Sequence, residues 1–281
     1  MLCVALAIAL LSSSVLSACA GQQVQKPNQA SVDTFPRSQI RPSNETTIDA
    51  SVFITLCAKE KSVENRIYFR YPQFKETTAN AEALNELIVE YVDSEVQKAC
   101  QGGFKGEIKG SPEDWKWNND EYQLQAMNIG YTIRRNDADY FSVTFDGLYN
   151  RRKAAHPYKY FSSLTIDVRE GKVVTLSDLY HIDTRFVELL RNKFKEQFQA
   201  RVIERGGSIA DASELGIEAF PKLDDATLVK ALRQTDEESD SFGFDSFITN
   251  TSVGISVDIG FALGGHFAVM ISYDELKPFA K

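Results

Sequence analysis

A short basic loop near the middle of the chain holds the histidine best placed to bind a ligand. His156 follows Arg151 and Arg152, and Tyr149 precedes them with a phenolic hydroxyl. One interpretation is a recognition site for an anionic or polar ligand, with His156 as a hydrogen-bond donor. The other interpretation, which we favour, is that His156 orders the loop by bonding a backbone carbonyl. The candidate binding residues of this segment are Tyr149, Arg151, Arg152 and His156.

Two tryptophans form a second candidate site. Trp115 and Trp117 lie in the glycine-rich stretch 101–120, which is long for a loop inside a compact domain, and such loops are often functional. One interpretation is that one ring is buried while the other stays exposed. An exposed tryptophan serves as an interface hot spot or stacks on a sugar ring. The interpretation we favour is that both rings pack on their own subdomain.

The sequence carries no motif of the common catalytic classes. It contains 3 histidines, and it lacks the His-Glu-x-x-His zinc motif, the Gly-x-Ser-x-Gly nucleophile elbow and the Gly-rich phosphate loop that ends in Lys-Ser/Thr. We therefore expect no catalytic residues, no metal site and no cofactor.

The N-terminus predicts a secreted lipoprotein. Residues 1–18 carry no charge and contain an apolar run typical of a signal-peptide core. The segment Leu16–Cys19 (Leu-Ser-Ala-Cys) resembles the bacterial lipobox, which implies cleavage before Cys19 and lipid attachment to it. Ordinary secretory cleavage after Ala18 is the alternative. Because Ala20 rather than Asp follows the cysteine, the resemblance to Gram-negative sorting rules implies a lipid anchor in the outer membrane, facing the periplasm.

Two further cysteines predict a disulfide. Cys57 and Cys100 remain once Cys3 leaves with the signal peptide and Cys19 takes the lipid. An even pair in an oxidising envelope compartment favours a bond between them. In the chain-entropy model, closing a loop of about 44 residues would stabilise the fold by roughly 4 kcal/mol. Two free thiols are the alternative, and a redox pair is disfavoured because the sequence has no Cys-x-x-Cys.

The charge balance limits the class of partner. The formal net charge is −8. This acidity argues against non-specific nucleic-acid binding, which needs a basic footprint. It favours encounter with a cationic partner instead.

Hydrophobic periodicity predicts an α+β fold, with antiparallel sheets and helices packed on one face of each. Thr184 to Arg205 repeats large apolar residues at helical spacing, with Asp183 or Thr184 as the expected N-cap, and Glu170-Gly171 marks a tight turn between two strands. Pro72 is expected to end the second strand. The expected helices cover residues 77–97, 184–205 and 224–233. The expected strands cover residues 51–59, 63–71, 122–134, 140–148, 164–168, 173–176, 242–249, 252–261 and 266–272.

Composition divides the chain into four parts. Residues 1–18 form the signal peptide, and residues 19–50 form a lipidated, polar tether that we expect to be disordered. Residues 51–149 form an N-terminal α+β subdomain. Residues 150–281 form a C-terminal α+β subdomain.

The central hairpin and the last hairpin carry residues that resemble a known family. Leu-Thr-Ile-Asp at 164–167 is followed by Gly171-Lys172 and by Thr-Leu-Ser-Asp-Leu-Tyr at 175–180, and a loop ending in Ala-His-Pro precedes them. Near the C-terminus, Gly264-Gly265 precedes Ile271, Tyr273 and Leu276. This pattern resembles a bacterial cell-envelope domain shared by the lysozyme-responsive anti-sigma factor of Gram-positive bacteria and the non-catalytic N-terminal part of a peptidoglycan deacetylase. The Pro-Tyr pair usual in the family's last hairpin is absent.

The resemblance implies a non-catalytic binding module of the cell envelope. The partners it suggests are a cationic, lysozyme-like protein or a cell-wall component. The sequence lacks the anti-sigma factor's transmembrane helix and sigma-binding segment, so signalling through a sigma factor does not carry over. The alternative is an envelope hydrolase acting on peptidoglycan, which is disfavoured because the deacetylase's metal-binding Asp and His motifs are missing.

Overall fold

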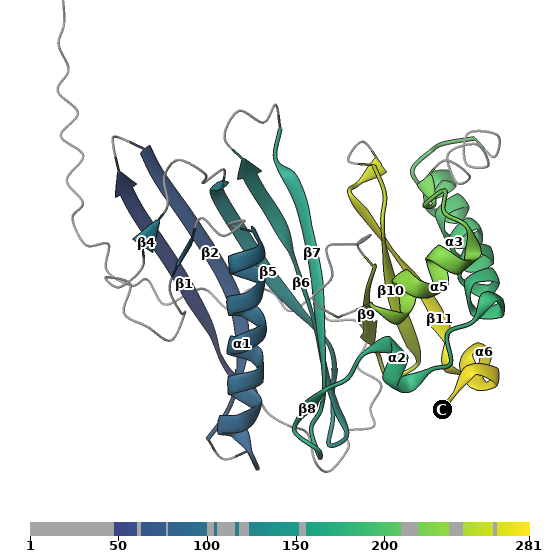
Figure 1. The fold of residues 1–281 in the computed structure, drawn as a ribbon, viewed down its shortest axis with the longest axis horizontal. Helices are drawn as coiled ribbons and strands as arrows, with labels where there is room; N and C mark the ends of the chain where they lie inside the picture. Colours follow the sequence, from purple (N-terminus) through teal and green to yellow (C-terminus); the bar gives the residue numbers. More distant parts are fainter. Residues whose placement is uncertain are drawn as a thin grey trace, which may run out of the picture. The chain divides into compact units, whose positions relative to one another are not determined.

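Two sheets, each with helices on one face, make up most of the described chain (Figure 1). The computed structural model describes residues 48–60, 63–76, 78–99, 104–105, 116–117, 124–151, 156–208, 219–235, 244–260 and 263–281, all inside one compact unit, Pro42–Lys281. The predicted α+β class is confirmed.

The larger sheet has six strands in the order β1-β2-β5-β6-β7-β8. Neighbouring strands are antiparallel except for β2 and β5, which run parallel with Arg66 beside Ala126. Helix α1 (Ala81–Ala99) lies between these two strands in the chain, as the crossover of a parallel pair requires. The strands are β1 (Ile48–Glu60), β2 (Val63–Phe74), β5 (Leu124–Asn136), β6 (Tyr140–Arg151), β7 (Tyr158–Asp167) and β8 (Lys172–Val173).

Alternation along the strands sends one set of side chains toward α1. On β6, Phe141, Val143 and Phe145 are completely buried in this core, while their neighbours Ser142 and Thr144 point to the opposite face. The Phe145 ring lies 5.3 Å from that of Phe69 on β2. Helix α1 contributes its own apolar stripe at spacings of three and four, namely Leu84, Ile88, Val92 and Val96.

A buried polar contact joins α1 to β7 within this core. The Tyr160 hydroxyl donates to Glu95 Oε2 at 2.5 Å and lies 2.8 Å from Ser162 Oγ, while Lys98 pairs with the other Glu95 oxygen at 2.9 Å. Burial, followed by the nearby Glu95 charge, raises the pKa of Tyr160 well above its ordinary value. The hydroxyl therefore stays protonated and continues to satisfy the Glu95 carboxylate.

The smaller sheet has the order β11-β10-β9, formed by β9 (Phe244–Ile248), β10 (Ser252–Asp258) and β11 (His266–Ser272). Helices α3 (Thr184–Glu204) and α5 (Asp225–Arg233) contribute to the core on one of its faces. The predicted aromatic stripe of α3 lies there, with the Phe194 ring 5.4 Å from that of Phe267. Gln197 on α3 bonds both the N–H and the C=O of Met270, and so occupies backbone groups of the edge strand β11.

The remaining elements are short. Strands β3 (Phe104–Lys105) and β4 (Lys116–Trp117) pair with each other. Helix α2 (Leu176–Leu179) follows the central hairpin, and α6 (Tyr273–Leu276) with the 3-10 helix η3 (Lys277–Phe279) ends the chain. Tyr180 and Ala280 form a bridge that ties this end back to the α2 segment.

The two sheets meet where β9 lies against the polar face of the larger sheet. The Ile248 N–H donates to Ser142 Oγ at 3.1 Å, and Ser163 Oγ donates to the Ser246 carbonyl at 2.8 Å. Just after β9, the Thr249 N–H donates to the Ser252 carbonyl on β10. Backbone groups along β9 therefore point alternately toward β10 and toward the larger sheet. Serine hydroxyls of β6 and β7 thus satisfy the edge of β9 that β10 leaves unpaired.

Aromatic packing completes this junction. The Phe247 ring lies so close to β10 that a Cβ added to Gly254 would sit 2.1 Å from its Cζ. The Arg134 guanidinium lies 5.0 Å from the centre of the same ring, and the centres of the Phe161 and His266 rings are 4.4 Å apart with the rings tilted by 40°. Because His266 is partly buried, desolvation lowers its pKa to about 4, and the cations Lys159 and Arg201 add to the lowering while Asp146 opposes it.

Several local predictions are confirmed by the geometry. Gly171 takes φ +62° in the turn after β7, and Asp183 caps α3 by accepting from the Phe186 N–H. Two expectations were wrong in detail. Strand β2 runs past Pro72 to Phe74, and the return strand after Gly171 is only Lys172–Val173. A capping box between Thr175 and Asp178 starts helix α2 instead.

The expected boundary between residues 149 and 150 also needs correction. Strands β7 and β8 belong to the same sheet as β5 and β6. The larger sheet therefore extends to Val173, and the second hydrophobic core begins with Leu176.

We expect Tyr160→Phe to lower the free energy of unfolding by about 1–3 kcal/mol, because it leaves a largely buried carboxylate without its hydroxyl donor. Urea unfolding followed by circular dichroism measures the change. Tyr68→Phe is the matched control, since Tyr68 is 38% exposed on the same sheet. Equal losses in the two variants would contradict a specific role for the Tyr160–Glu95 contact.

Stability should fall as the pH is lowered from about 6.5 to about 4, in part through His266. In that window the unfolded chain binds a proton at this histidine and the folded chain does not, because the folded pKa is the lower one. His266→Asn should flatten this part of the stability curve, whereas the exposed His156→Asn should not. Thermal unfolding across the window is the measurement, and identical acid profiles for wild type and His266→Asn would refute it.

Candidate functional site

The residues predicted around the central basic loop come together only in part. The rings of Tyr149 and Tyr158 stack 5.2 Å apart, and His156 lies 5.9 Å from Tyr158. His156 is exposed, and its Nδ1 lies 3.1 Å from the Pro157 carbonyl oxygen. This contact fits the loop-ordering interpretation. The backbone of Arg151 ends β6, and Arg152 lies outside the described residues.

The other predicted site residues are placed less completely. Trp117 lies in the short strand β4 and Cys57 in β1, each described by its backbone alone. Trp115, Cys100 and Cys19 lie outside the described residues. The tryptophan anchor, the Cys57–Cys100 disulfide and lipidation of Cys19 therefore stay predictions.

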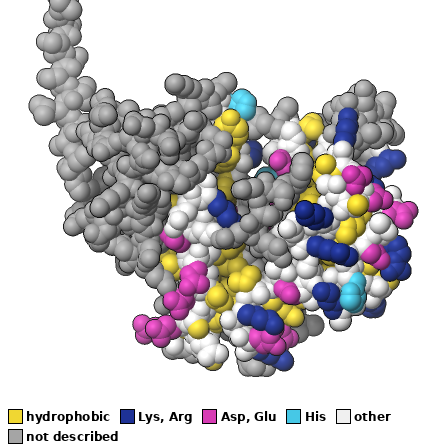
Figure 2. All heavy atoms as spheres, viewed as in Figure 1, with side chains coloured by type: hydrophobic (Ala, Val, Ile, Leu, Met, Phe, Trp, Pro, Cys, Tyr) yellow, Lys and Arg dark blue, Asp and Glu magenta, His cyan; other side chains and the backbone are white. Residues whose placement is uncertain are grey.

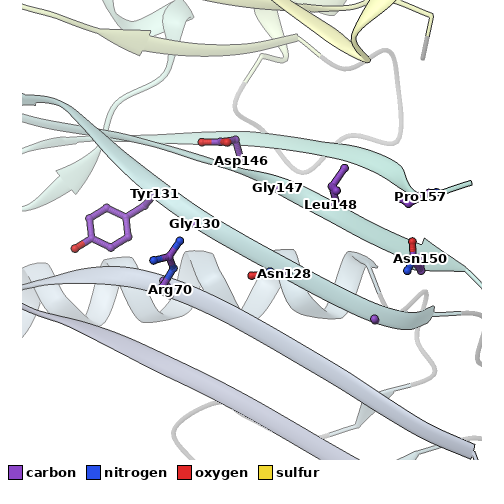
Figure 3. Close-up of a pocket in the computed structure, with 10 residues that line it drawn as sticks. Arg70, Asn128, Gly130, Tyr131, Asp146, Gly147, Leu148, Asn150 and Pro157 are labelled. Carbon is purple, nitrogen blue, oxygen red and sulfur yellow. The ribbon is translucent and has the colours of Figure 1, made fainter. Parts of the chain in front are cut away.

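A groove of about 540 Å³ lies on the face of the larger sheet opposite α1 (Figure 3). Met127 and Ile129 on β5 and Phe145 on β6 are buried in the α1 core, so the residues that alternate with them face the other way. Figure 3 shows Arg70 on β2 directed toward Gly130 on β5, with Asp146 on the neighbouring strand. The lining residues used below are Arg70, Asn128, Gly130, Asp146, Leu148 and Asn150.

Two glycines line this groove. A Cβ added to Gly130 would lie 2.8 Å from Nη2 of Arg70, so the guanidinium occupies the space above the glycine. A Cβ at Gly147 would lie 2.1 Å from the Asn128 carbonyl oxygen, which leaves room for glycine alone. The floor between the flanking side chains is therefore backbone.

The groove presents groups of both charges together with amides. Within the described part of the chain, the Arg70 guanidinium makes no hydrogen bond or ion pair. Asp146 is exposed, and its charge acts on Arg134 and on His266 at the junction of the two sheets. Asn128 and Asn150 each add an amide that both donates and accepts, and Leu148, 44% exposed, adds an apolar wall. Such a set is suited to binding a polar ligand.

This groove was not predicted from the sequence. Its polar residues alternate with core residues along β5 and β6, which is the ordinary pattern of a sheet with a solvent-facing side. The available signal was that alternation at Asn128, Gly130, Asp146 and Asn150. The partner Arg70 comes from β2, whose parallel pairing with β5 was not predicted.

A second groove of about 780 Å³ lies where α1 begins. Its charged lining is acidic, from Glu76, Glu82 and Glu86, with Asn80 and Asn85 between them. Figure 2 shows acidic side chains gathered at the lower left of the described surface, and many Lys and Arg side chains on its right. The first groove is mixed in charge and the second is negative.

Two other features are absent from the part of the chain that the structure describes. Among the described residues, no group of three or more His, Cys, Asp or Glu side chains is arranged to hold a metal ion. No helix in the described ranges has the length and apolarity needed to cross a bilayer.

Comparison with known proteins gives a fold and no activity. No family model and no curated protein matches the chain. Among solved structures, it is similar to a DUF3298 family protein from Pseudomonas aeruginosa PAO1, with 9% identity, a TM-score of 0.49 and coverage of 83% of this chain and 95% of that one. It is also similar to a DUF3298 member from Bacteroides fragilis NCTC 9343, with 11% identity, a TM-score of 0.50 and coverage of 85% and 95%.

DUF3298 is a domain of unknown function. At these identities the likeness extends to the fold alone. The chain thus shares its overall architecture with a structure of the DUF3298 family.

Proposed function

We propose that this chain is a lipid-anchored, non-catalytic binding module of the bacterial cell envelope, and that its ligand is a component of the cell wall. The observation that carries the proposal is the groove between Arg70 and Asn150, where hydrogen-bonding side chains from three adjacent strands converge on a backbone floor. The family resemblance of the central and last hairpins supports an envelope setting.

The chemistry of the groove matches that of peptidoglycan. Cell-wall polymers offer carboxylates, amides and hydroxyls, and the groove offers a guanidinium, two amides and a carboxylate. These side chains project from strands that are paired in the sheet, so the backbone that carries them loses little conformational entropy on binding. The exposed Leu148 side chain adds apolar contact to a ligand held by polar groups.

A cationic, lysozyme-like protein is the second candidate partner. The net charge of −8 and the acidic groove at Glu76, Glu82 and Glu86 favour it. Trp115 and Trp117 stay candidate anchors for such a protein, because exposed tryptophans often carry much of an interface's binding energy. The resemblance to the lysozyme-responsive family supports the same partner.

We expect the purified full-length chain to co-sediment with purified peptidoglycan sacculi, and to do so without releasing soluble fragments. Binding should saturate and should be reduced by soluble wall fragments, because a defined groove is occupied. Quantifying bound chain and released muropeptides after incubation makes both measurements. Release of fragments would replace the binding module with the alternative, an envelope hydrolase.

A parallel titration with lysozyme separates the two candidate partners. Association with lysozyme that slows as salt rises, with no binding to sacculi, would make the cationic protein the partner. Binding to neither would contradict both forms of the proposal.

Membrane attachment should depend on Cys19. The lipobox-like segment Leu16–Cys19 motivates this expectation, since a thioether-linked lipid is the only anchor it invokes. Cys19→Ala should move the protein from the membrane fraction to the soluble fraction of the envelope, whereas Cys57→Ala should not. Immunoblotting of fractionated cells measures the distribution, and membrane retention of Cys19→Ala would refute lipid anchoring.

A further inference from the structure

Arg70 and Asp146 lie on the two strands that flank Gly130. Gly130 pairs with Asp146 in the β5–β6 ladder, and the parallel β2–β5 register sets Phe69 beside Ile129, which carries Arg70 to the level of Gly130. Arg70, Gly130 and Asp146 thus lie in one row across three adjacent strands. Gly130 has no side chain, and the Arg70 guanidinium lies in the space above it, on the side of Asp146.

We infer that this groove binds a short peptide that carries a free carboxylate and a free amino group, with the carboxylate on Arg70 and the ammonium on Asp146. The inference rests on the proposed function, because it names the part of the cell wall that the module recognises. The arginine is able to hold a carboxylate through two parallel N–H···O bonds. The aspartate accepts from the ammonium group.

The positions of the amides favour a peptide over a single amino acid. The guanidinium of Arg70 lies over Gly130, so it is one strand spacing, roughly 4.8 Å, from the backbone of Asp146. Asn150 lies further along β6 than Asp146, roughly 13 Å along the strand. A ligand that reaches both the charges and this amide is longer than one amino acid.

The rest of the lining fits the same ligand. Asn128 and Asn150 match the N–H and C=O of peptide groups, because each amide both donates and accepts. The groove volume of about 540 Å³ lies in the range of small-molecule sites. Asp146 disfavours a polyanion such as a phosphate-rich polymer, since like charges repel.

Calorimetric titration with the soluble stem tripeptide of peptidoglycan tests the inference. The natural tripeptide is compared with one form whose carboxylates are all amidated and another whose amino groups are all acetylated. Arg70→Gln should weaken binding of the natural tripeptide about tenfold or more, and should have little effect on the amidated form. Asp146→Asn should weaken binding of the natural tripeptide and leave the acetylated form unchanged.

Two further variants keep the test specific. Gly130→Ala places a methyl group where the Arg70 guanidinium lies, so it should weaken binding of the natural tripeptide. The melting temperature of the protein should change little. Arg169→Gln is the matched control, because Arg169 is a largely exposed arginine in the turn beyond β7, outside the groove. It should bind the tripeptide as wild type does.

The outcomes separate this inference from the proposed function. Sacculi that still bind the chain when the tripeptide does not, or when Arg70→Gln and Asp146→Asn bind it as tightly as wild type, would overturn the peptide assignment and leave the binding module standing. Absence of binding to both sacculi and tripeptide would overturn both.

Discussion

The packing of the smaller sheet on the larger one depends on hydrogen bonds that satisfy the unpaired backbone groups of β9. A strand edge exposes N–H and C=O groups that must be satisfied when they are buried. Here Ser142 and Ser163 supply the hydroxyls that bond Ile248 and Ser246. The Ser142 Oγ in turn lies 2.9 Å from Thr165 Oγ1, so the hydroxyls that face β9 are also hydrogen-bonded to each other. This contact fixes the smaller sheet against the larger one.

The strands of the larger sheet are built for this contact by simple alternation. On β6, large apolar residues face α1 and small hydroxyl residues face β9, so one strand serves two different neighbours. Small side chains also let the second sheet come close enough for the Phe247 ring to approach Arg134 and Phe161 of the larger sheet. A large residue at Ser142 or Ser163 would both remove a hydroxyl and push β9 away.

The same alternation explains where the groove lies. Toward one end of β6 the face that meets β9 carries Ser142 and Thr144, and further along it carries Asp146, Leu148 and Asn150. Asp146 stands at the border, because its charge acts on Arg134 and His266 of the junction while it lines the groove. One face of one sheet thus holds the second sheet and, beside it, the candidate binding site.

Local chemistry made much of the secondary structure predictable. Gly171 marked the turn after β7, Asp183 marked the start of α3, and the repeated apolar residues of α3 marked its buried face. The helix at Thr175 was missed, although Thr175 and Asp178 form a recognisable capping box, because the apolar residues around them also fit a strand. Pro72 was read as a stop, but the strand continues beyond it.

What the sequence could not supply was the partner of each strand. Periodicity shows which face of a strand is buried, but it does not say that β2 lies parallel to β5 after a helix and a long connection. The groove depends on that pairing, since Arg70 reaches Gly130 only when β2 and β5 are neighbours. Candidates chosen along the chain, such as His156 and Trp115, were therefore local, whereas the groove is assembled from three strands.

The central claim is that the open part of the larger sheet, on the side away from α1, is the binding surface. Hydrogen–deuterium exchange with and without soluble cell-wall fragments tests this claim most directly. The account predicts slower exchange in β5 and β6 around Asn128–Gly130 and Asp146–Asn150, with α3 and α5 unchanged. Protection confined to α1 or to the helices of the second sheet, with β5 and β6 unchanged, would contradict it.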